Sequence, residues 1–417
     1  MQYAISTKNK IFQVLLFFLI YANCFSQNEA RFYKTIDTLS SQTFYGRGYL
    51  NQGHLKTADY LITAFEAYSD TAFKQAFSFG LNVIANEQLI IGNDTLATGV
   101  DFVPLPQSSS TYGLESFETV FLDSLFFHSR RKITKFIKKS IENKAIVYSS
   151  KFEGFITSNK LLHRKIYVES GAIIKLTDSD LMSSFSQSAW MPPSVIMKAD
   201  HWTYPEIVQL EVSQTEKSIN SFNVIGQING TDTSQKELIV CAHYDHVGGY
   251  SDCFVPGAND NASGVAMLLE LMNYFYINKP YRTMKFIAFG AEEVGLLGSS
   301  YYVQNASLDN IHFVLNLDLL GAGSKGLTVV NGSVFKEKFE LLNTINIQNS
   351  YFTKIKKRGE AANSDHYYFS KNGVPAFFVY SNGTVGGYHN VKDKPDDLEK
   401  GYFGNIFGLL RDFLIEL

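Results

Sequence analysis

From Asn223 onward, short apolar segments alternate with helical segments, and this alternation constrains the fold more than any other feature of the sequence. The apolar segments cover residues 237–242, 284–290, 311–317 and 374–380. Between the first two, residues 263–276 place apolar side chains at helical spacing on one face. Uninterrupted apolar runs are typical of strands buried on both faces, and strands that alternate with helices are typical of α/β proteins. We therefore predict an α/β fold with a mostly parallel central sheet and helices on both faces.

The part of the chain before residue 216 has a different sequence pattern. The length of 417 residues allows two or three domains, or one large domain with an insertion. Residues 31–79 read as helical, whereas residues 82–212 contain short β-rich runs separated by Ser, Gly and Pro clusters. We predict a helical N-terminal part of the main domain at 27–81, an inserted β-rich domain at 82–215, and the rest of the main domain at 216–417.

The first 26 residues have the layout of a cleaved secretory signal peptide. Lys8 and Lys10 precede an apolar run at 11–22, and short residues follow at 24–26. This predicts a secreted or periplasmic protein. Lipoprotein anchoring at Cys24 is the less favoured alternative, because Asn23 fits poorly where such a site wants a small residue. No later run is long enough to span a bilayer, so we expect no stable membrane insertion.

The net charge, the basic runs and the cysteines indicate which binding partners and cross-links to expect. The chain has 37 basic and 40 acidic residues, a formal net charge of -3, so it lacks the basic field of a nucleic-acid-binding protein. The basic runs 128–144 and 354–358 are expected to be solvated faces, the first an amphipathic helix with its apolar stripe packed inward; a membrane-surface or partner helix is the alternative. Cys241 lies in an apolar run and is expected to be a buried free thiol, and a disulfide with Cys253 is the alternative.

Histidines and carboxylates follow the apolar segments at the points where strands are expected to end. They are His243 and Asp245, Asp260 in the loop 257–264, Glu292 and Glu293, Asp318, and His389 in a glycine-rich loop. The carboxyl ends of strands in an open α/β sheet converge on one crevice, so these residues are expected to become neighbours. Imidazole nitrogen and carboxylate oxygen are ligands of zinc. Two histidines and three carboxylates are too many for one open zinc site, and they suit two metals that share a bridging carboxylate.

The same segments carry a resemblance to a known family. The motifs are His243-Tyr244-Asp245-His246, the loop 257–264, the run 291–299, Asn316-Leu317-Asp318, Ser364-Asp365-His366, and His389 with Asp393. Together they resemble the zinc aminopeptidase family that also contains glutamate carboxypeptidases and glutaminyl cyclases, that is, co-catalytic di-zinc exopeptidases. The resemblance is strong over 223–398 and faint at Gly46-Arg47. The block 82–215 weakly resembles the protease-associated insertion of these enzymes.

The resemblance implies a role for each residue. His243 and Asp318 would bind one Zn²⁺ ion, Glu293 and His389 would bind the other, and Asp260 would bridge them. Asp245 would hold His243 through its second ring nitrogen, and Glu292 would be the general base. A cis peptide bond between Asp260 and Asn261 is also implied. Some relatives place a tyrosine at the position of Ala361 to bind the tetrahedral intermediate, and Tyr388 is a candidate substitute here.

The resemblance therefore implies a secreted metallo-aminopeptidase that acts on peptides with a free N-terminus. The alternatives are a glutaminyl cyclase-type acyltransferase and a catalytically inactive family member. Inactive relatives lose ligands, whereas all five ligand types and the adjacent glutamate are present here. Carboxypeptidase activity on acidic dipeptides is a further alternative, which would require an arginine cluster that the sequence does not locate.

Overall fold

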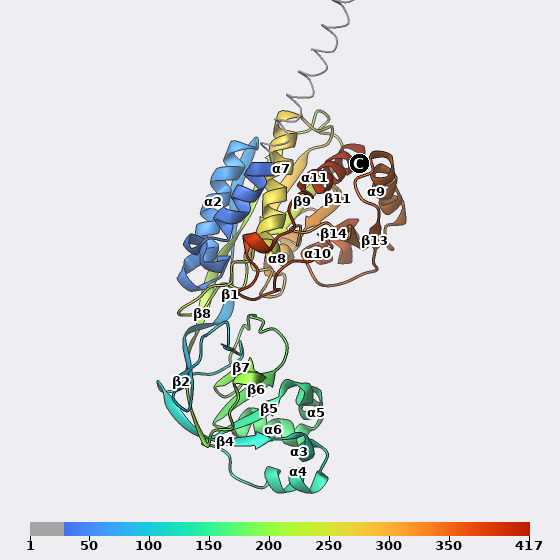
Figure 1. Ribbon diagram of the computed structural model, residues 1–417. Coiled ribbons are helices and arrows are strands. Elements are labelled where there is room, and N and C mark those ends of the chain that lie inside the picture. Colours follow the sequence, from blue (N-terminus) through green and yellow to red (C-terminus); the bar gives the residue numbers. More distant parts are fainter. Residues whose placement is uncertain (1–28) are drawn as a thin grey trace, which may run out of the picture.

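The computed structural model describes residues 29–417, and it contains a main α/β body from which a second, smaller body projects (Figure 1). The predicted signal peptide and Cys24 lie outside the described residues. Within 29–417, no helix has the length and apolar character required to cross a membrane.

The central sheet of the main body is mixed, with a parallel core. Its strands follow the order β13 (Ile355–Lys357), β12 (Leu327–Val330), β14 (Ala376–Ser381), β11 (Ile311–Leu317), β9 (Glu237–His243), β10 (Met284–Phe289) and β8 (Ile207–Ile228). The four strands β14, β11, β9 and β10 run parallel to one another, while β12 and β8 pair antiparallel with the ends of this set. In register, Phe289 lies beside His243 and Leu317 beside Val379, so the parallel strands end at one edge of the sheet.

Helices cover both faces of this sheet, as predicted. One face packs against the helix at 29–39, α2 (Gly53–Ala67), α7 (Gly264–Ile277), α9 (Lys336–Asn349) and α11 (Phe403–Glu416). The other face packs against α8 (Leu297–Asn305) and α10 (His366–Lys371). The central strands are uniformly apolar because both of their faces are buried, which is why the sequence shows no alternation there.

A long two-stranded ribbon joins the two bodies. Strand β1 (Thr71–Ile91) pairs antiparallel with β8 over its whole length, from Thr71 opposite Gln227 to Ile91 opposite Val208. One end of β8 pairs with β10 of the main body, and the other end pairs with β4 (Glu115–Leu122) of the smaller body. The hydrogen-bonded sheet therefore continues from one body into the other.

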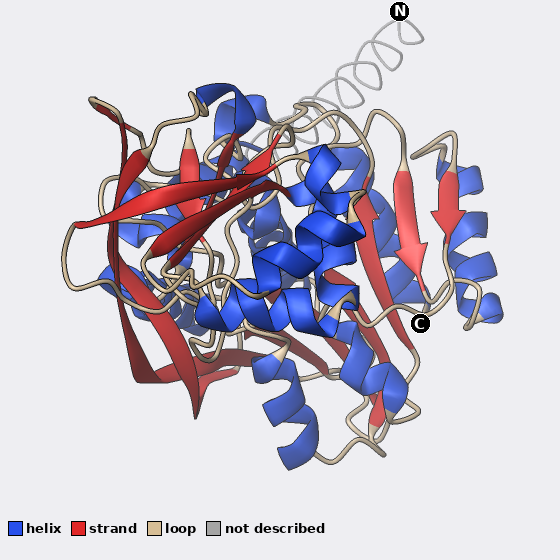
Figure 2. Cartoon of the chain, turned by 90° about the horizontal axis from the view of Figure 1, so that it is seen from below, coloured by secondary structure: helices blue, strands red, loops and turns tan. Residues whose placement is uncertain are grey.

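The smaller body contains helices as well as the predicted strands. Strands β4, β5 (Lys144–Ser149), β6 (Ala172–Thr177) and β7 (Ser194–Lys198) are parallel neighbours, and β3 (Phe102–Pro104) pairs antiparallel at the edge. Helices α3 (Ser124–Phe127), α4 (Arg130–Ile137), α5 (Glu153–Ser158) and α6 (Lys160–Glu169) pack on this sheet, and the view from below shows helices among the strands (Figure 2). Helix α4 forms within the basic run and buries Ile133 and Phe136, as expected.

Short elements complete the described chain. They are β2 (Asp94–Thr95), the 3-10 helices η1 (Gln42–Arg47), η2 (Leu50–Gln52), η3 (Ser150–Phe152), η4 (Ala199–His201) and η6 (Pro395–Asp397), and the π-helical turn η5 (Ala258–Ser263). Cys241 and Cys253 are both free, and Cys241 is buried, which confirms the prediction of a buried free thiol.

Candidate metal centre

The predicted site residues gather at the edge where the parallel strands end. His243 is the last residue of β9, Asp318 directly follows β11, and Glu292 and Glu293 lie just beyond β10. Asp260 is in η5, which opens α7, and His389 is in the loop after β14. A cavity of about 220 Å³ is lined by His243, Asp260, Glu292, Glu293 and Asp318 together with Leu319, Arg358, Asn363, Phe378, Tyr380 and Tyr388.

Asp260 lies between two sets of side chains. Its Oδ1 atom is 3.4 Å from His243 Nε2, and the same nitrogen is 3.4 Å from Asp318 Oδ1. Its Oδ2 atom is 3.1 Å from His389 Nε2, which in turn is 3.0 Å from Glu293 Oε2. The two carboxylate oxygens of Asp260 therefore face two different imidazoles, each of which has a second carboxylate beside it.

The backbone around Asp260 is held from two directions. The Asp393 carboxylate accepts hydrogen bonds from the amides of Asn259 (2.8 Å) and Asp260 (3.0 Å). The buried guanidinium of Arg47 donates to the carbonyl oxygens of Gly257 (2.7 Å) and Asp260 (3.0 Å). The peptide bond between Asp260 and Asn261 is cis, which confirms that expectation.

Asp245 makes different contacts from those expected. The Nδ1 atom of His243 lies 3.1 Å from the backbone carbonyl oxygen of Asp245, so the expectation that the carboxylate holds this imidazole is wrong. The carboxylate instead accepts hydrogen bonds from the amides of Glu292 (3.0 Å) and Glu293 (3.3 Å) and from the Tyr49 hydroxyl (3.1 Å). Two adjacent amides at the turn after β10 offer donors in the same direction, and the carboxylate satisfies both. Asp245 thus fixes the segment that carries the two glutamates.

Buried polar atoms test whether these residues suit a metal. Asp318 Oδ1 and His389 Nε2 are buried and make no hydrogen bond within the described chain. These two atoms lie 3.0–3.4 Å from neighbouring imidazole or carboxylate atoms without the alignment of a hydrogen bond, which is costly unless the groups coordinate a cation. Ligand atoms of His243, Asp260 and Asp318 lie within 4.8 Å of one another, and so do those of His246, Asp260, Glu293 and His389. The donor types and their crowding fit divalent zinc.

The electrostatics of the cluster also favour positive charge. Burial opposes protonation of both imidazoles, yet the carboxylates around them outweigh it. Glu292 and Asp318 raise the pKa of His243 well above its usual value, and Glu293 with Asp260 raises the pKa of His389 to about 11. In the protein alone, the carboxylates therefore favour protonated His243 and His389, and a metal cation supplies the same compensating charge.

Glu292 differs from its neighbour Glu293. Burial, followed by the nearby Glu293 and Asp365 carboxylates, raises the pKa of Glu292 well above the usual value, although His243 lowers it. Burial also opposes ionisation of Glu293, but His389 and His246 lower the pKa of that carboxyl far below its usual range. Of two adjacent carboxyl groups, one is thus set to bind a proton and the other to stay ionised.

Sequence reasoning gave no role to several residues that touch the site. His246 is fully buried, and its Nδ1 atom lies 2.8 Å from Glu293 Oε1. The sequence signals Arg47 only through a faint resemblance. Arg358 is exposed, as expected for the basic run 354–358, and it also lines the cavity. The spacing of His246, three residues after His243, was the one signal available for it.

The smaller body contributes to the site as well. The backbone carbonyl of Ser183 lies 3.2 Å from His389 Nδ1, and the Ser183 amide donates to the His389 carbonyl at 2.8 Å. The Ser183 hydroxyl bonds the buried Tyr250 hydroxyl, which follows β9 by a short loop. The segment around Ser183, about 200 residues away in the sequence, therefore fixes the ring orientation of His389. No local sequence motif predicts this contact.

Tyr388, the candidate for binding the tetrahedral intermediate, lines the cavity. Tyr388 is 53% exposed, lines the cavity, and stacks on the His389 ring with centroids 3.9 Å apart. Its hydroxyl can donate a hydrogen bond into the cavity, because burial and the neighbouring Asp260 and Glu293 carboxylates raise its pKa and keep it protonated.

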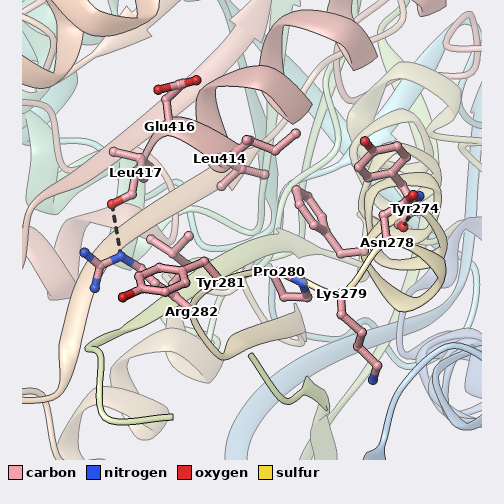
Figure 3. Close-up of a pocket in the computed structure, with 12 residues that line it drawn as sticks. Tyr274, Asn278, Lys279, Pro280, Tyr281, Arg282, Leu414, Glu416 and Leu417 are labelled. Carbon is pink, nitrogen blue, oxygen red and sulfur yellow. Dashed lines mark hydrogen bonds between the residues drawn. The ribbon is translucent and has the colours of Figure 1, made fainter. Parts of the chain in front are cut away.

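A larger cavity, of about 470 Å³, lies at the C-terminal ends of α7 and α11, away from the metal-ligand candidates (Figure 3). Tyr274, Tyr281 and Arg282 line it, and Arg282 Nε donates to the Leu417 oxygen at 3.0 Å. Among its lining residues Glu416 is the single carboxylate side chain, and none is a histidine. The chemistry is therefore concentrated in the smaller cavity.

Comparisons with known proteins agree with this placement. The profile of peptidase family M28 matches residues 223–414, which include every candidate ligand. A probable zinc metalloprotease of Pyricularia oryzae is 38% identical over 133 residues, which are 30% of this chain and 26% of that protein. Aminopeptidase YwaD of Bacillus subtilis is 31% identical over 202 residues, which are 43% of this chain and 41% of that protein. The match thus spans less than half the length of these curated relatives.

The likeness to a solved structure extends over both bodies. The zinc aminopeptidase BSAP from Bacillus subtilis superposes with a TM-score of 0.74 at 21% identity, covering 93% of this chain and 95% of that one. At this level of identity the likeness shows a shared fold. The smaller body and the ribbon therefore belong to an architecture that a solved protein also has.

Proposed function

Because residues 223–414 match the model of peptidase family M28, we propose that the chain belongs to this family and is a zinc-dependent aminopeptidase that releases N-terminal residues from peptides. The observation that carries this proposal is the position of Asp260, whose two oxygens face two separate imidazole–carboxylate pairs. A bridging ligand between two ions needs that geometry.

In this proposal the five predicted ligands hold two zinc ions. His243 and Asp318 bind one, Glu293 and His389 bind the other, and Asp260 is shared. When bound, zinc in such a pair polarises the scissile carbonyl and lowers the pKa of a water molecule. Asp393 and Arg47 keep Asp260 in place through its backbone.

Glu292 acts as the general base. It lines the cavity beside the ligand Glu293 without belonging to either imidazole–carboxylate pair. Its raised pKa suits a carboxylate that takes a proton from the attacking water and then returns it to the leaving amine. Asp245 supports this step by holding the amides of Glu292 and Glu293. Tyr388 donates its hydroxyl proton in a hydrogen bond to the oxyanion.

We further propose that the protein is exported through the signal peptide at 1–26, which rests on the sequence pattern alone. Amino-terminal sequencing of the protein recovered from its native host tests this. A mature chain that begins near Gln27 is the expected result, and a chain that retains Met1 contradicts it.

The catalytic proposal is tested by hydrolysis of leucine 4-nitroanilide in the presence of zinc, with the N-acetylated compound as the matched control. We expect cleavage of the free-amine substrate alone, loss of activity with a zinc chelator, and recovery when zinc is added back. Equal cleavage of the acetylated compound would contradict an aminopeptidase. Conversion of glutaminyl peptides to pyroglutamyl products without hydrolysis would favour the glutaminyl cyclase alternative.

A further inference from the structure

The cavity that holds the metal cluster also contains one arginine. Besides the metal-ligating groups and Glu292, its lining comprises Arg358 and five uncharged residues, including Phe378 and Tyr380. Arg358 follows β13 at the outer edge of the sheet, and its amide donates to the Val329 carbonyl of β12 at 2.8 Å. The sheet thus holds the backbone of Arg358, and its exposed side chain lines the cavity.

The guanidinium is anchored and has unused donors. Arg358 Nη1 donates to the Tyr380 hydroxyl at 3.1 Å, and Tyr380 is itself packed against Phe378 with ring centroids 5.3 Å apart. No carboxylate of residues 29–417 lies within 4.0 Å of the Arg358 nitrogens. An arginine has five N–H donors in a planar fork, so four of them remain for a ligand.

The chemistry of this arrangement selects a carboxylate. A guanidinium fork pairs with carboxylate oxygens in two parallel hydrogen bonds, and holding the fork in advance reduces the entropy lost on binding. The volume of about 220 Å³ is below the range of roughly 300–1,000 Å³ typical of pockets for drug-sized ligands. It suits one or two amino-acid residues next to the metal cluster.

We infer that Arg358 binds a carboxylate of the substrate and gives the enzyme a preference for acidic substrates. This inference rests on the proposed aminopeptidase function and names its substrate class. The carboxylate has two sources, namely the side chain of an N-terminal glutamate or aspartate, and the C-terminal group of a dipeptide. Phe378 and Tyr380 supply an apolar wall for the methylene groups that precede either carboxylate.

Two substrate pairs that differ in one charge test the inference. The first pair is glutamyl and glutaminyl 4-nitroanilide, and the second is Leu-Leu and its amide. For each pair the ratio of kcat/KM values is measured in the wild type, in Arg358→Gln and in Arg358→Lys. Lys354→Gln is the matched control, since it removes a positive charge from an exposed side chain of the same segment that does not line the cavity.

We expect the wild type to prefer the charged member of at least one pair by about tenfold or more, which is the range of a charge-assisted hydrogen-bonded pair. Arg358→Gln should bring that ratio to near one, Arg358→Lys should give an intermediate ratio, and Lys354→Gln should keep the wild-type ratio. The pair that responds identifies the source of the carboxylate. Tyr380→Phe, which removes the anchor, should lower the same ratio in part.

A binding measurement separates this inference from the proposed function. Calorimetry on the zinc-loaded protein compares glutamate with glutamine, and leucine with leucinamide, in the wild type and in Arg358→Gln. Cleavage of leucine 4-nitroanilide with ratios near one for both pairs would overturn the inference and leave the proposed function standing. Failure to cleave any substrate would overturn the proposed function. In that case the calorimetry alone would test whether Arg358 binds a carboxylate, and equal affinities for the charged and uncharged ligands would overturn the inference.

Discussion

Glu292 and Glu293 are adjacent in sequence, and the structure gives them opposite electrostatic surroundings. Glu293 has two imidazoles within 3.0 Å of its oxygens, whereas Glu292 has burial and like charges around it. Two identical side chains therefore have different proton affinities, and only the three-dimensional arrangement determines which one is the base.

The role of the base is tested by Glu292→Gln. The amide neither accepts the proton of water nor returns it, so we expect kcat for leucine 4-nitroanilide to fall by about 10²- to 10⁴-fold while both zinc ions remain bound. Metal analysis of the same sample is the control. Undiminished turnover with full metal content would remove Glu292 from the mechanism.

The bridging role is tested by Asp260→Ala. This change takes one ligand from each ion, so the zinc content after dialysis should fall well below that of the wild type. Asp309→Ala, which removes an exposed carboxylate from a surface turn, should keep the wild-type zinc content. A full metal-to-protein ratio in Asp260→Ala is the result that the bridge does not allow.

At this scale the sequence identified residue types better than contacts. The ligand candidates were predictable because each follows a recognisable strand. The contacts of Asp245 were not, because an aspartate two residues after a histidine can present either its carboxylate or its backbone carbonyl. The place of Arg358 at the cavity was not predictable, because an exposed arginine in a basic run has the same sequence pattern whether or not it lines a cavity.

At the scale of elements, β11 and α9 meet through an unusual pair. His312 Nε2 of β11 lies 3.1 Å from Lys338 Nζ of α9. Burial first, and then Lys338, lower the pKa of His312 from its ordinary 6.5 to about 4. The unfolded chain therefore binds a proton more readily than the folded chain between these values. The contribution of neutral His312 is complete above about pH 6.5 and is lost as the pH falls towards 4.

The variant His312→Gln has no such titration. Its Tm should decline less steeply than that of the wild type between pH 6.5 and 4, by about 1–2 °C, because the half-exposed side chain is screened by solvent. His128→Gln, at an exposed position beside α3, should follow the wild-type curve. Parallel curves for wild type and His312→Gln would show that the pair has no energetic consequence.

The loop of the smaller body that contains Ser183 contacts His389, a proposed metal ligand. Tyr250→Phe removes the partner of the Ser183 hydroxyl and loosens the carbonyl that faces His389 Nδ1. We expect zinc to be lost at about threefold lower chelator concentration than in the wild type, a smaller effect than removal of a direct partner of a ligand. Tyr276→Phe, on an exposed face of α7, is the control, and equal chelator sensitivity in the two variants would contradict this coupling.

The whole molecule combines two α/β bodies on one continuous sheet. The main body was predictable, since its buried strands and amphipathic helices have distinct periodicities. Helix α4 of the smaller body was predictable from its amphipathic basic run, but α3, α5 and α6 were not, because they are only four to ten residues long and have no strong pattern. The ribbon was missed for another reason: β1 crosses the predicted boundary near residue 82 without a break. Long-range pairing of this kind leaves no local signal in the sequence.

The ribbon positions the smaller body so that Ser183 contacts His389. Because β1 and β8 pair over their full length, the two bodies have a defined relative position, and Ser183 reaches the site only in that position. The loop of the smaller body thus contacts His389, a proposed ligand of the metal centre.

The central claim is that Asp260 bridges two zinc ions, and one crystallographic measurement tests it most directly. Anomalous diffraction data collected at the zinc absorption edge from crystals of the zinc-loaded protein should show two peaks, about 3.5–4 Å apart. One peak should lie against His243 and Asp318 and the other against Glu293 and His389, with an oxygen of Asp260 in contact with each. A single peak at this cluster, or two peaks with Asp260 bound to only one of them, would contradict the account.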